Sequence, residues 1–234
     1  MKVFKGFLWA AALLLPASMM ARTVQERLND ATDVLHDILA APDRGIPHDL
    51  LDKAYCVVII PGMKKAAFVV GGEYGRGFAV CRRESGSGWG APAAVRMEGG
   101  SVGFQIGATS TDLVLLVMNR HGMQQLLRDK FTLGGDASVA AGPVGRTATA
   151  NTDAMMTAEI LAWSRAKGLF AGVSVAGSTL RNDLDENERL YGRKIDNHEV
   201  LMSAMATPPA AERLDHTLDE TSMRQEGSAD RVKH

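Results

Sequence analysis

Ser101 is the residue whose type and spacing come nearest to a catalytic motif in this sequence. Gly99–Gly103 has the G-x-S-x-G spacing of a hydrolase nucleophile elbow, which requires a strand before the serine and a helix after it. Here Val102, Phe104 and Ile106 alternate with small or polar residues, which is the period of a strand. The pattern predicts a Gly-rich bend that enters a strand, and a serine hydrolase using Ser101 is the least favoured alternative.

Two other stretches resemble ligand-binding loops without meeting their requirements. Gly71–Gly77 has neither the dinucleotide-binding nor the P-loop spacing, and no helix follows it, so we predict a hairpin turn. Asp183 begins a run like a calcium loop, but Glu188 and Lys194 stand where Gly and Glu are needed. The six histidines include no pair at the i, i+4 spacing of a helical metal site. We therefore expect no metal, no cofactor and no catalytic residue.

The clearest charge pattern is a basic segment between residues 53 and 96. It holds seven basic and two acidic residues, an excess of five positive charges, whereas the whole chain has a net charge of −1. That near-neutral balance argues against nucleic acid as a partner. If the strands of the segment are neighbours, their turns would form a basic surface for phosphate headgroups; the alternative is a solvated strand rim. The candidates for contact with such headgroups are Lys64, Lys65, Arg76, Arg82 and Arg83.

The spacing of apolar residues indicates the elements that must position these side chains. Residues 24–39 have apolar side chains at three- and four-residue steps, which predicts an amphipathic helix that packs on a sheet. Short helices are predicted at 123–130, 185–191 and 198–205. Strands are predicted at 56–60, 67–71, 75–82, 93–98, 101–108, 112–118, 136–141, 146–150, 159–164 and 168–176. Short strands separated by Gly favour an α+β fold with a predominantly antiparallel sheet or barrel-like core.

The two ends of the chain differ in composition from its middle. Residues 1–21 combine two lysines, a short apolar run and small residues, the layout of a cleavable secretory signal peptide. We therefore expect export to the periplasm and a single domain over residues 22–206; an uncleaved membrane anchor is the alternative. Residues 207–234 are polar and begin near Pro208-Pro209, which predicts a flexible tail.

Cys56 and Cys81 both lie in strand-like sequence. An oxidising compartment would permit a disulfide between them. Two buried free thiols are the competing interpretation, because the sequence does not show whether the two strands are neighbours.

From about Leu28 to Gly192 the sequence resembles the SYLF lipid-binding domain family. Each matching stretch is weak alone, but their number and order make the resemblance specific. The stretches are Pro42–Pro47, Val57–Phe68, Gly71–Gly77, Gly99–Gly107, Lys130–Gly134, Ala140–Gly145, Ser164–Ser174 and Tyr191-Gly192.

The resemblance implies a non-enzymatic domain that binds lipids, with phosphoinositides as the ligands of eukaryotic members. Those members also carry an SH3 domain and associate with actin. No SH3 sequence is visible here, so we do not expect this chain to share the association with actin. For an exported protein of bacterial appearance, we expect an anionic phospholipid or membrane surface as the partner. The alternative is an envelope scaffolding protein that binds another protein through its tail.

Overall fold

The computed structural model describes residues 22–41, 45–68, 70–83, 88–102, 107–144, 157–166 and 168–222. Its helices are α1 (Val24–Ala40), α2 (His48–Lys53), α3 (Arg120–Leu126), α5 (Leu184–Tyr191), α6 (Asn197–Met202), the 3₁₀ helix η1 (Pro209–Ala211) and α7 (Glu212–Thr221). Its strands are β1 (Cys56–Phe68), β2 (Val70–Cys81), β3 (Ala93–Val102), β4 (Gly107–Val117), β5 (Lys130–Thr132), β6 (Val139–Ala141), β7 (Ile160–Ala166), β8 (Leu169–Gly172) and β9 (Thr179–Asn182).

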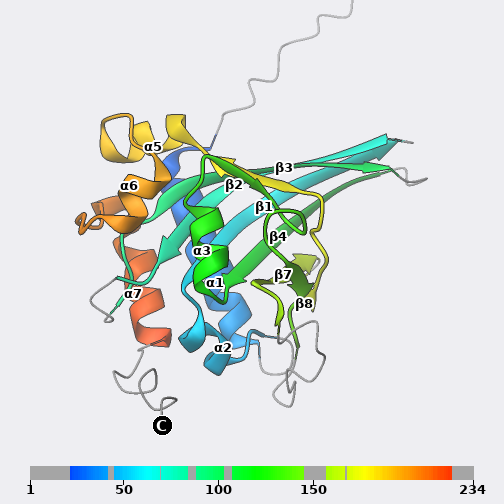
Figure 1. The fold of residues 1–234 in the computed structure, drawn as a ribbon, viewed down its shortest axis with the longest axis horizontal. Coiled ribbons are helices and arrows are strands. Elements are labelled where there is room, and N and C mark those ends of the chain that lie inside the picture. The colour runs from blue at the N-terminus through cyan, green and yellow to red at the C-terminus, as the bar shows by residue number, and fades with distance from the viewer. Residues whose placement is uncertain are drawn as a thin grey trace, which may run out of the picture.

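The strands form one curled sheet in the order β5-β9-β3-β2-β1-β4-β7-β6, with β8 also paired to β7. All the pairs are antiparallel except β6 with β7. The four long strands β1 to β4 continue beyond the helices as an extended arm (Figure 1). The predicted α+β class, with a mostly antiparallel, half-barrel-like core and an N-terminal helix, is confirmed.

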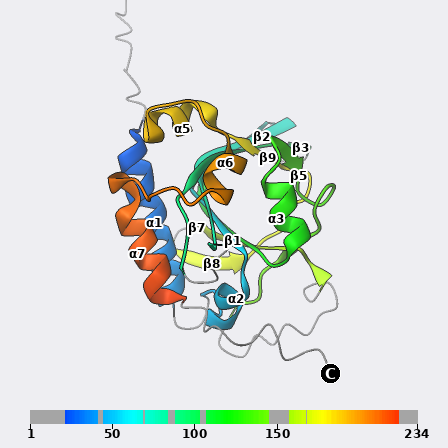
Figure 2. The same cartoon turned by 60° about the vertical axis from the view of Figure 1, so that its left-hand side comes forward.

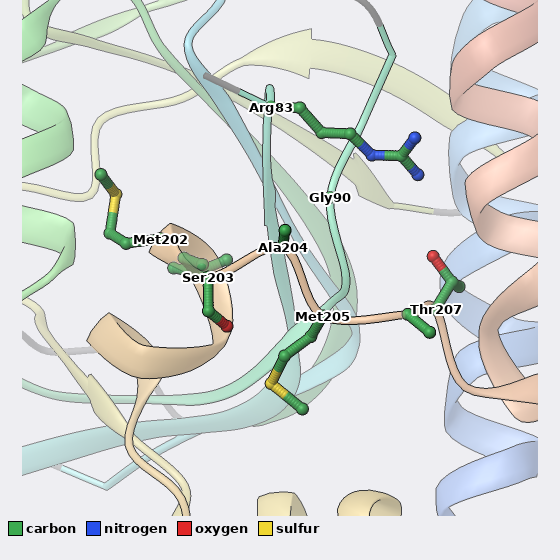
Figure 3. Close-up of a pocket in the computed structure, with 9 residues that line it drawn as sticks. Arg83, Gly90, Met202, Ser203, Ala204, Met205 and Thr207 are labelled. Atoms are coloured by element: carbon green, nitrogen blue, oxygen red, sulfur yellow. The ribbon is translucent and has the colours of Figure 1, made fainter. Parts of the chain in front are cut away.

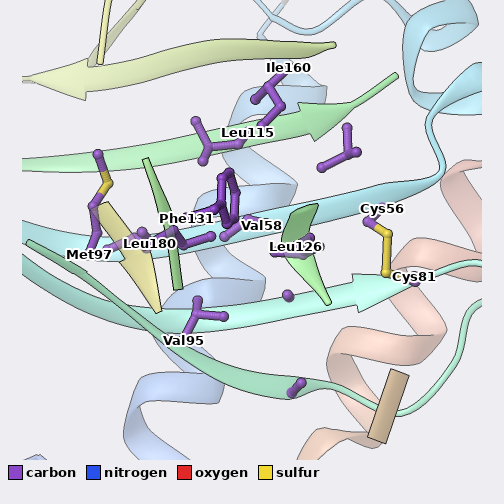
Figure 4. Packing of buried hydrophobic residues seen from close by; sticks show 14 of the residues in the cluster. Cys56, Val58, Cys81, Val95, Met97, Leu115, Leu126, Phe131, Ile160 and Leu180 are labelled. Atoms are coloured by element: carbon purple, nitrogen blue, oxygen red, sulfur yellow. A yellow bond between two sulfur atoms is a disulfide. The ribbon is translucent and has the colours of Figure 1, made fainter. Parts of the chain in front are cut away.

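The sheet is buried on both sides, which divides the apolar core into two layers. The inner layer, on the side of α3 and α6, contains Val58, Leu115 and Leu180 (Figure 4). The outer layer, on the side of α1 and α7, contains Leu35 and Phe78. Figure 2 shows the sheet curling around α3 and α6, with α1 and α7 packed together outside it. We call the side of α3 and α6 the inner face of the sheet and the side of α1 and α7 its outer face.

The predicted N-terminal helix is present as α1. Thr23 accepts a hydrogen bond from the Glu26 amide, while the Glu26 carboxylate accepts one from the Thr23 amide, so a capping box starts the helix. Leu28, Leu35 and Ile38 form part of the buried stripe that faces the sheet. Among the described helices, none has the length and apolar character needed to cross a bilayer. The predicted signal peptide, residues 1–21, lies outside the described residues.

A β-bulge at Pro61-Gly62 determines which face each side chain of β1 occupies. Before it, Val57 and Ile59 belong to the outer layer. The register shifts between Ile59 and Lys64 against β2 and between Ile60 and Met63 against β4. The phase of the strand is therefore reversed: Met63 joins the inner layer and Lys64 lies on the outer face.

The hairpin turn predicted at Gly71–Gly77 is wrong, because this stretch lies inside β2. The glycines are needed for a close approach to β1 at its bulge. A Cβ on Gly75 would lie 2.5 Å from Ile60 Cγ2, and one on Gly77 would lie 1.9 Å from the Ile59 carbonyl oxygen. Similarly, the helix predicted at 123–130 begins earlier, as α3 with Asn119 at its N-cap, and ends before β5.

The flexible tail predicted from residue 207 is wrong for residues 209–221, which form η1 and α7. Leu214 and Leu218 of α7 are fully buried against the outer layer. Arg213 of α7 also forms an ion pair with Asp33 of α1, with 2.7 Å between Nη2 and Oδ1. The folded domain therefore continues through α7, and residues 223–234 lie outside the described residues.

Cys56 and Cys81 lie directly opposite one another on β1 and β2 and form a disulfide, which decides between the two interpretations of this pair. The bond closes the antiparallel β1–β2 pair at the end away from its hairpin (Figure 4).

Replacing both cysteines by alanine should lower the free energy of unfolding by about 3 kcal/mol, because the bond restricts a loop of 25 residues in the unfolded chain. Urea unfolding of the oxidised protein, the reduced protein and the variant measures this. Reduced wild-type protein should resemble the variant. Two titratable thiols in protein that was never reduced, with an unchanged midpoint on reduction, would show that the bond does not form.

Candidate functional site

Lys64 and Lys65, the two adjacent lysines predicted to contact lipid, lie on opposite faces of the sheet. Lys64 is exposed on the outer face, where its Nζ donates a hydrogen bond to Ser110 Oγ at 2.9 Å. Lys65 is on the inner face and forms an ion pair with Glu73, its cross-strand neighbour, with 3.0 Å between Nζ and Oε2. They therefore do not act as one charged pair, and only Lys64 is free of a carboxylate partner among the described residues.

Arg82, which we predicted to contact lipid, is instead a structural residue. It is 8% exposed, and its guanidinium donates hydrogen bonds to the carbonyl oxygens of Leu51, Ala54 and Ser222 at 3.0–3.1 Å. The same group lies 4.3 Å from the ring centroid of Trp89. Arg82 thus ties α2 and the end of α7 to the sheet and presents no surface to a membrane.

Arg76 holds helix α5 against β2. Its Nε lies 2.9 Å from Asp183 Oδ2 and also donates to Tyr74 Oη, and its Nη1 lies 3.7 Å from Glu186 Oε2. Burial works against its charge, but Asp183, Tyr74 and Glu186 together raise the pKa of the guanidinium. Because Arg27 of α1 contacts the same Glu186, at 3.1 Å, this network joins β2, α5 and α1.

Arg76 is also the first member of a row of four cations that the register of the sheet brings together. Arg76 lies directly opposite Arg96, Arg96 opposite Arg181, and Arg181 opposite Lys130. Directly paired residues share a face, so all four lie on the outer face, on β2, β3, β9 and β5. We call these four residues the basic row. Lys64 and the exposed Tyr74 lie on the same face, opposite each other on β1 and β2.

Like charges directly opposite one another across strands are unfavourable, so the row needs anions nearby. Within the fold, the Glu98 carboxylate forms ion pairs with Arg96 Nε at 3.2 Å and with Arg181 Nη1 at 3.3 Å. The Nε of Arg96 is buried, and it is the atom that faces Glu98, although their contact lacks hydrogen-bond geometry. Lys130 is exposed, and no described carboxylate lies within 4.0 Å of it. The internal compensation therefore weakens toward the β5 end, where an external anion has access.

The basic row is only partly visible in the sequence. Arg76 was predicted as a contact, and Arg96 was counted in the basic segment but not assigned. Arg181 and Lys130 were missed, because they are far from that segment in sequence and only the pairing of β9 with β3 and β5 brings them near it. Alternation within the short strands offers no signal for this pairing.

Arg83, the remaining predicted contact, lies away from the row at the edge of a cavity. The cavity has a volume of about 400 Å³ and lies between Arg83 and Gly90 on one side and the segment from Leu201 to Thr207 on the other. Figure 3 shows the 203–207 part of this segment, which connects α6 to η1, passing across the chain at Gly90. Arg83 is exposed at its rim. The five predicted cations therefore do not form a single surface.

Among the described residues, Asp215 of α7 is the ion-pair partner of Arg83, with 3.9 Å between Oδ2 and Nη2. The same Oδ2 accepts a hydrogen bond from Thr207 Oγ1 at 3.1 Å. Burial raises the pKa of the Asp215 carboxyl, Asp219 adds to this effect, and Thr207 and Arg83 oppose it. The Asp215–Arg83 contact is long, so it neutralises the Arg83 charge only in part.

Ser101 lies inside β3, where its backbone is paired with Gly71. A nucleophile elbow instead requires the serine at a sharp turn from a strand into a helix. The predicted strand is therefore confirmed at this residue, and the described structure gives the hydrolase alternative no support.

Comparison with known proteins places this fold in a family. The family model Ysc84, described as a Las17-binding protein actin regulator, matches residues 98–221, which is more than half of the chain. The chain belongs to the Ysc84 (SYLF) family. The predicted resemblance to SYLF domains is thereby confirmed.

Relatives of this Ysc84-family chain are found in fungi and animals. It is 34% identical over 208 residues to LAS seventeen-binding protein 3 of Saccharomyces cerevisiae, covering 88% of this chain and 45% of that protein. It is 36% identical over 175 residues to Protein YSC84 of the same species, covering 74% and 37%. It is 32% identical over 192 residues to SH3 domain-containing YSC84-like protein 1 of Homo sapiens, covering 82% and 56%. The chain spans about half the length of these curated relatives.

The structural role of Arg82 predicts a contrast with its neighbour. Arg82→Met should lower the free energy of unfolding by about 3 kcal/mol, because three buried carbonyls lose a charged donor. Arg83→Met, at an exposed position, should change it by about 0.5 kcal/mol or less. Urea unfolding of both variants measures the difference, and equal stabilities would show that the Arg82 contacts do not hold the fold together.

Proposed function

We propose that this Ysc84-family domain binds anionic phospholipid headgroups without catalysing a reaction, and that the basic row is its contact surface. The observation that supports this most directly is the row itself, in which four cations directly oppose one another across four strands. Carboxylates of the fold compensate Arg76, Arg96 and Arg181, so a bound phosphate would mainly offset the repulsion at the Lys130 end of the row.

The side chains of the row suit phosphate. Arg181 has a planar guanidinium that can donate two parallel hydrogen bonds to a phosphate group, and Lys130 adds an exposed point charge. Lys130 is exposed and Arg181 is half-buried, so a headgroup can reach the β5 end of the row, whereas Arg76 is held by Asp183 and Glu186. Tyr74, which is 45% exposed on the same face, is of the residue type that favours the membrane–water interface.

We also propose that the protein acts in the cell envelope, exported by a signal peptide at residues 1–21. The layout of these residues supports export. The Cys56–Cys81 disulfide supports an oxidising compartment such as the periplasm. There the anionic glycerophospholipids of the membrane would be the ligands.

A protein partner is the second candidate function. The family description refers to Las17 binding, and one yeast relative is named LAS seventeen-binding protein 3. In this chain the outer surface of α7 carries Glu212, Asp219 and Glu220 around a shallow hollow that also includes Asp215. A basic partner would suit this acidic surface, and the partner would bind folded α7 and not a flexible tail.

The lipid proposal is tested with vesicles of phosphatidylcholine, with and without phosphatidylglycerol. Wild-type protein should cosediment with the anionic vesicles only, and less so as salt rises, because the attraction is screened. Lys130→Glu combined with Arg181→Glu should weaken this binding at least tenfold, since each cation near an anionic surface contributes about 1 kcal/mol.

A matched control is Lys53→Glu combined with Arg213→Glu. It makes the same change in net charge at exposed positions on α2 and α7, and Arg213, like Arg181, is ion-paired to a single carboxylate. This control should bind like wild type if the row is the contact surface. Equal loss in both variants would show that only net charge matters, and undiminished binding by the row variant would exclude the row.

A further inference from the structure

The cavity beside Arg83 is lined by polar and apolar groups in nearly equal measure. Leu201, Met202, Ala204, Met205 and Ala206 contribute apolar side chains, and Arg83 is the cation that lines it. Methionine side chains are flexible and polarisable, so Met202 and Met205 can adjust to the shape of an alkyl chain. The volume, about 400 Å³, is near the lower end of the range for small-molecule sites. An elongated, slender ligand with one apolar end fits this composition.

Donors for an anion are present at the same place. Among the described residues, the guanidinium of Arg83 donates no hydrogen bond, and its ion pair with Asp215 is at 3.9 Å. The backbone amides of Ala204, Met205, Ala206 and Thr207 likewise donate to no described acceptor. Ala204 and Ala206 are exposed, so their amides can bond either water or a ligand that enters the cavity next to Arg83. Both kinds of donor favour a carboxylate.

We propose that this cavity binds a single-chain fatty acid, with its carboxylate at Arg83 and its alkyl chain against Met202 and Met205. One cation matches one carboxylate, and the volume suits one alkyl chain and not the two chains of a phospholipid. The site is separate from the basic row: it is formed by the segment after α6 and the chain around Gly90, whereas the row lies on β2, β3, β9 and β5. It therefore does not depend on the proposed binding of membranes.

Asp215 is the group that competes with the ligand. Its carboxylate is near Arg83 on the α7 side, and it is also held by Thr207, which lines the cavity. A bound carboxylate would replace Asp215 as the partner of Arg83. Removing the Asp215 charge should therefore strengthen binding, whereas removing the Arg83 charge should weaken it.

The test is isothermal titration calorimetry of the intact protein with acetate, octanoate and decanoate, below the concentrations at which they form micelles. Decanoate should bind with one-to-one stoichiometry, and about tenfold more tightly than octanoate, because two more methylenes are buried. Arg83→Gln should weaken decanoate binding about tenfold or more, through loss of a charge-assisted hydrogen bond. Asp215→Asn should strengthen it.

Arg193→Gln is the matched control, because Arg193 is also an exposed arginine with one acidic partner, Glu199. It should bind decanoate as wild type does, and the Lys130→Glu/Arg181→Glu variant should do so as well. Lysophosphatidylglycerol is titrated as a second arm, and tighter binding of it than of decanoate would overturn the assignment to a fatty acid. The same affinity for acetate and decanoate, or for the Arg83→Gln variant and wild type, would overturn the site itself.

Discussion

The structure depends on the pairing of β1 with β2 on one side and β4 on the other. This pairing continues past the bulge at Pro61-Gly62. There Asp112 of β4 accepts a hydrogen bond from the Gly62 amide at 2.8 Å and forms an ion pair with Arg165 at 2.7 Å. Since a shift of one residue moves every following side chain to the other face, the bulge decides what each face presents. It allows apolar residues of β1 to fill both core layers and still leaves Lys64 on the outer face.

Features set by local spacing could be predicted from the sequence. The stripe of α1, the strand content and the antiparallel class all follow from short-range periodicity. Features set by contacts between distant segments could not. Gly75 and Gly77 look like turn residues, but they are small because β1 approaches them closely at its bulge. Leu214 and Leu218 stand one helical turn apart in a polar segment, a signal too short to outweigh its composition.

The candidate site shows the same limit for charge. The five predicted cations were chosen because they are close in sequence. Consecutive side chains of a strand, however, point to opposite faces of the sheet. Lys64 and Lys65 are therefore separated by the sheet, and Arg82 is used inside the fold. The basic row follows the opposite rule: its members are distant in sequence and adjacent across strands. An excess of charge in a segment thus describes only the composition of that segment. The register of the paired strands determines whether the charges lie on one surface.

The two proposed sites differ in how they would select a ligand. In the basic row, Glu98 and the acids of α5 already compensate much of the charge, so an external anion gains only a modest advantage over them. Binding there would therefore discriminate poorly among headgroups. In the cavity, one guanidinium and a limited volume leave the length of the alkyl chain as the variable that changes affinity most. Under these two proposals, a membrane surface and a single free chain would bind at separate places on the domain.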